Sequence, residues 1–101
     1  MNGRFLNIIN SNKPVLVDFF ADWCQPCKQM SPILKEVKSE LKENVRIIKV
    51  NVDKNPAIAT RYQIRSIPTV IVFKNGEPIW KGIGLQPACD LKTILRKHIN
   101  G

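Results

Sequence analysis

Cys24 and Cys27 are the residues of this sequence best placed to do chemistry. Two thiols at this spacing can close a small disulfide ring, exchange it with a partner, or supply half of a metal site. The pair follows the run 15–20, VLVDFF, and precedes a segment with helical spacing. Cys24 therefore falls at a helix N-terminus, where free N–H groups and the helix dipole stabilise a thiolate. We expect Cys24 to attack a partner disulfide and Cys27 to resolve the mixed disulfide.

A structural metal pair is the main alternative for two cysteines at this spacing. Zinc normally takes four ligands, and the only other Cys and His residues are Cys89 and His98. They lie nine residues apart in one expected helix, a spacing that does not suit a shared site. The sequence therefore predicts redox chemistry and no metal. Cys89 remains open: free cysteines are usually buried and inert, but an exposed one could be regulatory or form a dimer.

Helices and strands are expected to alternate around the cysteine pair. Apolar residues between Met30 and Leu41 recur at helical offsets. The dipeptide Asn75-Gly76 favours a tight hairpin, and Pro78 places the returning strand at a sheet edge. A helix between the first two strands makes those strands parallel. The expected order is a short helix near 5–9, a strand over 15–20, a helix reaching 41, a strand over 45–52, a short helix over 56–62, strands over 69–73 and 79–83, and a final helix over 87–99.

Length and composition limit the class of protein. With 101 residues, 44% of them hydrophobic, the chain fits a single domain over residues 1–101. No apolar run approaches the roughly 18 residues that a membrane span requires. The segment Met1–Pro14 lacks the apolar stretch of a signal peptide, so a cytoplasmic location is expected. Three cysteines are also too few for a disulfide-stapled secreted module.

The net charge of +8 comes from 16 Lys and Arg against 8 Asp and Glu. These basic residues are scattered along the chain, and no basic cluster is interleaved with aromatic residues. Nucleic-acid binding is therefore not expected. The charge predicts a well-solvated surface, with a preference for acidic partners as the sharper hypothesis.

The stretch 18–28, DFFADWCQPCK, resembles the active-site stretch of thioredoxins. The segments 67–69, IPT, and 73–76, FKNG, and then Gly84 follow at the spacing that this family uses. The resemblance covers the chain from about residue 13 to its end. It implies a thioredoxin fold: three α/β/α layers around a mixed sheet of about four strands, the family's leading edge strand being absent. It also implies a thiol-disulfide oxidoreductase that acts as a general protein-disulfide reductase.

The resemblance also implies roles for residues away from the cysteines. Pro68 is expected to be a cis-proline opposite the cysteine pair, with Ile67 offering backbone groups to an extended substrate. Asp18 is similar to the family's buried aspartate, and its apolar strand should raise its pKa so that it can exchange a proton with Cys27. Lys49 matches the lysine that pairs with this aspartate.

The expected substrate-binding surface surrounds the pair. Gln25 stands where thioredoxins usually carry Gly, so the redox potential can differ from the roughly −270 mV typical of thioredoxin. Pro26 is retained, which favours a reductant, and Phe20 replaces the family's usual first Trp. The residues implied to bind substrate are Trp23, Gln25, Pro26, Ile67, Thr69 and Gly84, of which Trp23, Ile67 and Gly84 would form an apolar rim.

The resemblance implies partners but no bound cofactor. Electrons are expected from NADPH through a thioredoxin reductase, and the substrates are disulfide-containing proteins, with acidic ones preferred. A monomer is expected. Two other functions stay open: a non-catalytic binding subunit that uses the apolar rim, and a thiol oxidase or isomerase of an oxidising compartment.

Overall fold

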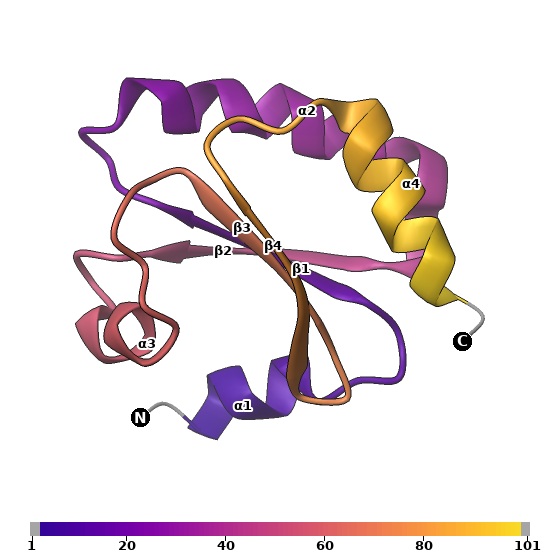
Figure 1. Cartoon of the computed structure of the whole chain (residues 1–101), viewed down its shortest axis with the longest axis horizontal. Coiled ribbons are helices and arrows are strands. Elements are labelled where there is room, and N and C mark those ends of the chain that lie inside the picture. Colours follow the sequence, from indigo (N-terminus) through magenta and orange to yellow (C-terminus); the bar gives the residue numbers. More distant parts are fainter. Residues whose placement is uncertain (1–2, 100–101) are drawn as a thin grey trace.

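A four-stranded mixed sheet lies between two layers of helices in the computed structural model, which describes residues 3–99 (Figure 1). The helices α2 and α4 cover one face, and α1 and α3 cover the other. This three-layer arrangement confirms the fold predicted from the sequence. The elements are α1 (Gly3–Ile9), β1 (Val15–Phe20), α2 (Gln25–Leu41), the short 3-10 helix η1 (Lys42–Asn44), β2 (Arg46–Asn51), α3 (Pro56–Arg61), β3 (Thr69–Lys74), β4 (Glu77–Ile83) and α4 (Ala88–Ile99).

The sheet has the strand order β2-β1-β3-β4. β1 is parallel to β2, and β3 and β4 form an antiparallel hairpin, as the sequence predicts. The structure adds that β1 is antiparallel to β3. Asn75 and Gly76 both have positive φ, at 53° and 82°, which is the conformation that a two-residue hairpin turn requires. Their N–H groups donate to the carbonyls of Ser11 and Ile9 at 2.7 and 3.0 Å.

The return strand β4 begins at Glu77, two residues earlier than the predicted 79–83. Pro78 therefore lies inside the strand, opposite Phe73, where the pairing register shifts. An edge strand tolerates proline because its missing N–H faces away from the sheet or falls at an irregularity. The predicted edge position of Pro78 is thus confirmed, but proline does not delay the start of the strand.

The central strand β1 is buried on both faces, as its continuous apolar run predicts. Leu16 packs in the core cluster beneath α2 and α4, whereas Val17 and Phe19 pack in the cluster beneath α1 and α3. Because side chains alternate along a strand, Asp18 faces the same side as Leu16. The fold therefore places this carboxylate beneath α2. Among residues 3–99, no helix combines the length and apolar character needed to cross a bilayer.

Gly82 is buried in β4, where a larger side chain has no room. A Cβ at this position would overlap the ring of Trp80, which packs against the core, and would lie 2.9 Å from Cδ of Gln86. We expect Gly82→Ala to lower the free energy of unfolding by about 1–3 kcal/mol through overpacking, as measured by urea denaturation. Gly3→Ala is the control, since nothing lies within 4 Å of a Cβ there. Equal stabilities of the two variants would contradict this packing.

Candidate active site

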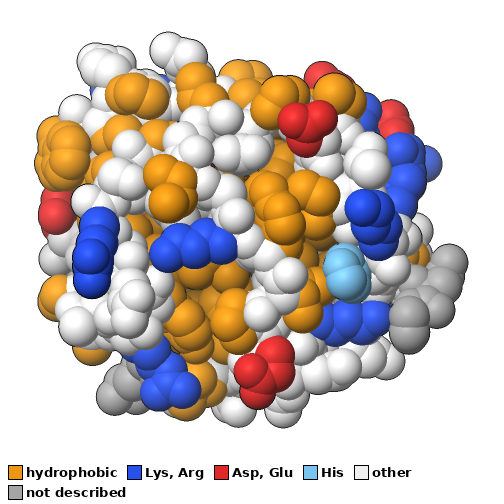
Figure 2. All heavy atoms as spheres, in the orientation of Figure 1, with side chains coloured by type: hydrophobic (Ala, Val, Ile, Leu, Met, Phe, Trp, Pro, Cys, Tyr) orange, Lys and Arg blue, Asp and Glu red, His pale blue; other side chains and the backbone are white. Residues whose placement is uncertain are grey.

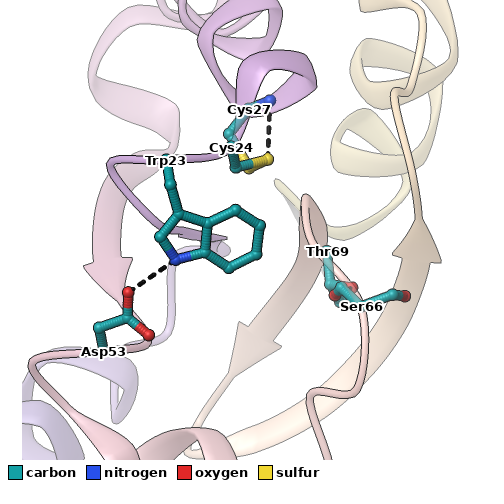
Figure 3. Close-up of a disulfide and its surroundings, with 6 residues drawn as sticks. All are labelled: Trp23, Cys24, Cys27, Asp53, Ser66 and Thr69. Atoms are coloured by element: carbon teal, nitrogen blue, oxygen red, sulfur yellow. Dashed lines mark hydrogen bonds between the residues drawn. A yellow bond between two sulfur atoms is a disulfide. The ribbon is translucent and has the colours of Figure 1, made fainter.

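The cysteine pair lies where β1 has ended and α2 begins (Figure 3). Cys24 is the N-cap of α2, with an extended backbone, and it forms a disulfide with Cys27 across a Cα–Cα distance of 5.3 Å. The backbone N–H of Cys27 donates to Sγ of Cys24 at 3.2 Å. This N–H and the positive end of the helix dipole favour negative charge on that sulfur once the disulfide is reduced. The geometry thus positions Cys24 as the sequence predicts.

Asp18 is a fully buried carboxylate on β1. Neither of its oxygens has a hydrogen-bond partner among the described residues. Burial raises the pKa of Asp18 from 3.8 to about 6, and the positive charge of Lys49 offsets part of this effect. The apolar surroundings of β1 therefore raise the pKa of Asp18, as predicted.

Lys49 is the register partner of Asp18 on the neighbouring strand β2. The structure shows no direct ion pair between the two side chains. The Lys49 ammonium instead donates to Oγ of Ser31 at 2.9 Å and stands 5.1 Å from the centre of the Phe20 ring. The predicted pairing is thus an electrostatic interaction at longer range, in which Lys49 lowers the cost of charging Asp18.

A cavity of about 140 Å³ gives water a place beside Cys27. Lys28 and Lys49 contribute its positive charge, and Asp22 contributes a carboxylate. The cavity is lined by Phe20, Ala21, Asp22, Cys27, Lys28 and Lys49. The cavity therefore leaves room for solvent next to the otherwise buried Cys27.

The peptide bond between Ile67 and Pro68 is cis, as the resemblance implies. Ile67 packs against the cluster that contains both cysteines. The Pro68 carbonyl accepts the N–H of Gly84 at 2.8 Å, and Gly84 has φ of 87°, a conformation that favours glycine. Thr69 donates its hydroxyl to the carbonyl of Ser66 at 2.7 Å. These contacts bring the predicted residues 67–69 and Gly84 together on one side of the site.

Of the predicted apolar rim, Trp23 is exposed, whereas Ile67 and Gly84 are half-buried. Trp23 has 69% of its surface accessible, and with Ile67 it lines a groove of about 230 Å³ that also includes Arg65. Gln25 and Pro26 are exposed in the first turn of α2. Figure 2 shows the molecule with β4 nearer the viewer than β2, and on that face hydrophobic side chains are interspersed with Lys and Arg. At the site itself, the exposed indole of Trp23 lies beside the buried disulfide (Figure 3).

Comparison with known proteins agrees with this geometry. The family model described as Thioredoxin matches residues 2–97.

The chain belongs to the thioredoxin family.

Relatives and solved structures of thioredoxins cover nearly all of the chain. A thioredoxin of Rickettsia felis is 49% identical over 92 residues, which are 91% of this chain and 88% of the relative. A thioredoxin-like protein of Synechocystis is 50% identical over the same coverage. Mitochondrial thioredoxin 3 of Saccharomyces cerevisiae, in its oxidised form, superposes with a TM-score of 0.83 at 34% identity, covering 93% of this chain and 87% of that one. Thioredoxins are protein-disulfide reductases, and the predicted enzyme class, thiol-disulfide oxidoreductase, is confirmed.

The sequence did not single out two polar residues of this thioredoxin site, Asp53 and Asn51. The indole N–H of Trp23 donates to Oδ2 of Asp53 at 2.9 Å (Figure 3). The Asn51 side chain accepts the backbone N–H of Asp53 at 2.9 Å and donates to Asp22 at 3.4 Å. Asn51 is the last residue of β2 and Asp53 follows it, and the carboxyl ends of parallel strands share one edge of a sheet. That topology was the signal that could have placed them beside the cysteines.

The exposed apolar residues Ile83 and Leu85 were also not predicted, at 66% and 41% accessible surface. They flank Gly84 in the sequence. Cys89 is exposed on the first turn of α4, with Sγ 3.6 Å from Oδ1 of Asp90. Among residues 3–99, no three His, Cys, Asp or Glu side chains lie close enough together to hold a metal ion.

Proposed function

We propose that this thioredoxin-family chain is a general protein-disulfide reductase in which Cys24 is the nucleophile and Cys27 the resolving thiol. The observation that carries the proposal is Cys24 at the N-cap of α2, within disulfide distance of Cys27. The Cys24 thiolate attacks one sulfur of a substrate disulfide, that S–S bond breaks, and one substrate thiolate leaves. The Cys27 thiolate then attacks Cys24, and the second substrate thiolate leaves. Two electrons pass to the substrate, and the disulfide between Cys24 and Cys27 remains.

Asp18 takes the proton of Cys27 before the second attack. Two observations support this role: the carboxylate is buried without a hydrogen-bond partner among the described residues, and its pKa is raised to about 6. Such a group is ionised at pH 7 yet holds a proton more readily than an exposed aspartate. Lys49 tunes this equilibrium through its charge, and the cis-proline Pro68 holds the loop opposite the cysteines.

The substrate lies against the rim as an extended segment. The proposed contacts are apolar ones to Trp23 and backbone ones to Ile67, whose cluster includes both cysteines. The exposure of Trp23 supports this role, since an apolar side chain left open to water beside a reactive group is suited to contact a partner. The remaining proposed contacts are Gln25, Pro26, Thr69 and Gly84.

Electrons reach the chain from NADPH through a thioredoxin reductase, with no cofactor bound to the chain itself. We further propose that the protein works in the cytoplasm as a monomer and as a single domain over residues 1–101. The test follows NADPH oxidation with a bacterial thioredoxin reductase and insulin as the substrate. Consumption that requires both the chain and insulin supports the proposal. A non-catalytic binding subunit would consume no NADPH, and a thiol oxidase would be a poor substrate for the reductase.

The basic surface selects acidic substrates in this proposal. Arg65 lines the groove beside Trp23, and Lys28 is exposed in the first turn of α2. We expect KM for an acidic disulfide protein to rise at least about threefold between 0.05 and 0.5 M NaCl, because salt screens exposed charges. A basic disulfide protein is the control, and its KM should fall or stay level. The same response for both substrates would leave the charge without a role in selection.

A further inference from the structure

The outer edge of β2 offers backbone groups to a further strand. β2 ends the sheet, and within residues 3–99 its neighbour is β1 alone. The N–H groups of Arg46 and Val52 donate to the carbonyls of Pro14 and Phe20, on the β1 side. Because backbone groups alternate in direction along a strand, those of the intervening residues 47 and 49 point away from β1. Such an edge is a template for pairing with another chain.

Hollows lie on both faces of this edge: a mainly apolar one beside Ile47, and one beside Ile48 that is lined by both apolar and polar side chains. Ile47 and Ile48 are half-buried and belong to opposite faces, since Ile47 packs beneath α2 and Ile48 beneath α1 and α3. A hollow of about 240 Å³ adjoins each of them. Leu34 joins Ile47 in the first, and Phe5 joins Ile48 in the second. Successive side chains of an added strand would point to alternate faces, so two neighbouring apolar residues would reach both hollows.

Positive charge surrounds the edge because the lysines of α2 lie on its side nearer β2, whereas its glutamates lie on the side nearer α4. The carboxylates Glu36 and Glu40 of α2 form three ion pairs with Lys92 and Arg96 of α4. Lys35 and Lys38 are spaced by three residues and so share one side of α2. Both line the hollow of Ile47 together with Lys49, while Arg46 is exposed on β2 itself. The carboxylates of α2 are thus engaged on the side away from β2.

We propose that the outer edge of β2 binds an extended acidic and apolar segment of a partner protein as a fifth strand. The segment exchanges hydrogen bonds with the backbone of residues 47 and 49 and places two adjacent apolar side chains in the hollows of Ile47 and Ile48. Its flanking carboxylates lie near Lys35 and Arg46. A second copy of this chain fits poorly, because it would bring the same lysines together. This binding needs no thiol and so does not depend on the proposed reductase activity.

A labelled synthetic peptide tests the backbone part of this proposal. The probe is acetyl-Glu-Glu-Val-Ile-Glu-Glu-amide, titrated into the ¹⁵N-labelled chain at low salt. We expect the largest amide shifts at Ile47 and Lys49, and slower hydrogen exchange at both. The matched control carries an N-methyl group on both Val and Ile. Because backbone groups alternate along a strand, one of these two methyl groups removes a donor that faces β2, and the charge is unchanged. The control peptide should bind at least about tenfold more weakly, because one backbone hydrogen bond is lost and the methyl group in its place keeps the strands apart.

Charge reversal on the protein tests the rest. The double variant Lys35→Glu and Arg46→Glu should weaken peptide binding about tenfold and leave insulin reduction unchanged. Lys97→Glu, on the exposed side of α4, is the control and should bind like the wild type. Equal binding of the N-methylated peptide, or shifts that centre on Trp23 and Ile67, would overturn the proposal. So would a dimer formed through β2 without peptide, or tighter binding of a single-stranded oligonucleotide at the same residues.

Discussion

Replacing Cys24 by serine is expected to reduce the rate of insulin reduction to that of dithiothreitol alone. Serine has nearly the size of cysteine and can still accept the Cys27 N–H, so the N-cap of α2 stays intact. Its hydroxyl is not ionised near neutral pH, however, and it cannot form the mixed disulfide. Turbidity of the precipitating insulin B chain measures the rate, and circular dichroism checks the fold. A Cys24→Ser variant as fast as the wild type would contradict the proposed nucleophile.

Two further cysteine variants make the assignment of roles specific. Cys27→Ser retains the attacking thiolate but lacks the resolving one, so it should accumulate a mixed disulfide with its substrate. A non-reducing gel detects this adduct, and dithiothreitol releases it. Cys89→Ser is the matched control, because Cys89 is an exposed free thiol outside the disulfide, and it should keep the wild-type rate. Adducts formed by Cys24→Ser instead would reverse the roles of the pair.

Replacing Asp18 by asparagine is expected to stabilise the protein strongly above pH 7. The pKa of this buried carboxyl is about 6 in the folded protein and 3.8 ordinarily. Below pH 3.8 both states hold the proton, so the charge has no effect on stability. As the pH rises from 3.8 to about 6, the unfolded chain ionises first and stability falls. Above that range, the buried charge lowers the free energy of unfolding by its full amount, about 3 kcal/mol for this difference in pKa.

Urea denaturation at pH 3.5 and pH 8 measures this effect. The free energy of unfolding of Asp18→Asn should exceed that of the wild type by about 2–3 kcal/mol at pH 8 and by much less at pH 3.5. Glu43→Gln, an exposed carboxylate in η1, is the control and should show no such pH-dependent gain. A constant difference between Asp18→Asn and the wild type at both pH values would mean that charge burial is not the cause.

The same variant tests the proton transfer separately from stability. In the wild type, release of the reduced substrate should slow as the pH falls through about 6, because a protonated Asp18 cannot accept the Cys27 proton. Asp18→Asn should release substrate more slowly at pH 7 and lose this pH dependence. Stopped-flow measurement of the second step distinguishes this outcome from a change in substrate binding. An unchanged pH profile would remove Asp18 from the mechanism and leave it a purely structural role.

Patterns local in sequence were the ones that predicted structure well. The apolar run of β1 and the helical spacing of α2 are each contained within one element, so burial and direction follow from periodicity. The apolar residues on both faces of β1 also bury Asp18. Asn75 and Gly76 fixed the hairpin because few residues accept positive φ at both positions.

Contacts between distant residues were not predictable in this way. Trp23 and Asp53 are 30 residues apart, and their hydrogen bond exists only because β1 and β2 are parallel neighbours. The Lys49 ammonium donates to Ser31, which lies 18 residues earlier on α2 and reaches Lys49 only through the packing of α2 on the sheet. Ile83 is exposed because no other element among residues 3–99 packs over its side chain, and the sequence of β4 alone does not specify how the other elements pack.

The tip of the β3–β4 hairpin, at Asn75 and Gly76, is tied by hydrogen bonds to the beginning of the chain. The amides of Asn75 and Gly76 are bound by the chain at Ser11 and Ile9, the last turn of α1 and the residues after it. Local opening of a protein proceeds in cooperative units whose members lose their contacts together. The first helix and the tip of the last hairpin therefore form one such unit, although more than sixty residues separate them. A loop inserted at this turn would loosen the beginning of the chain as well as the hairpin that carries it.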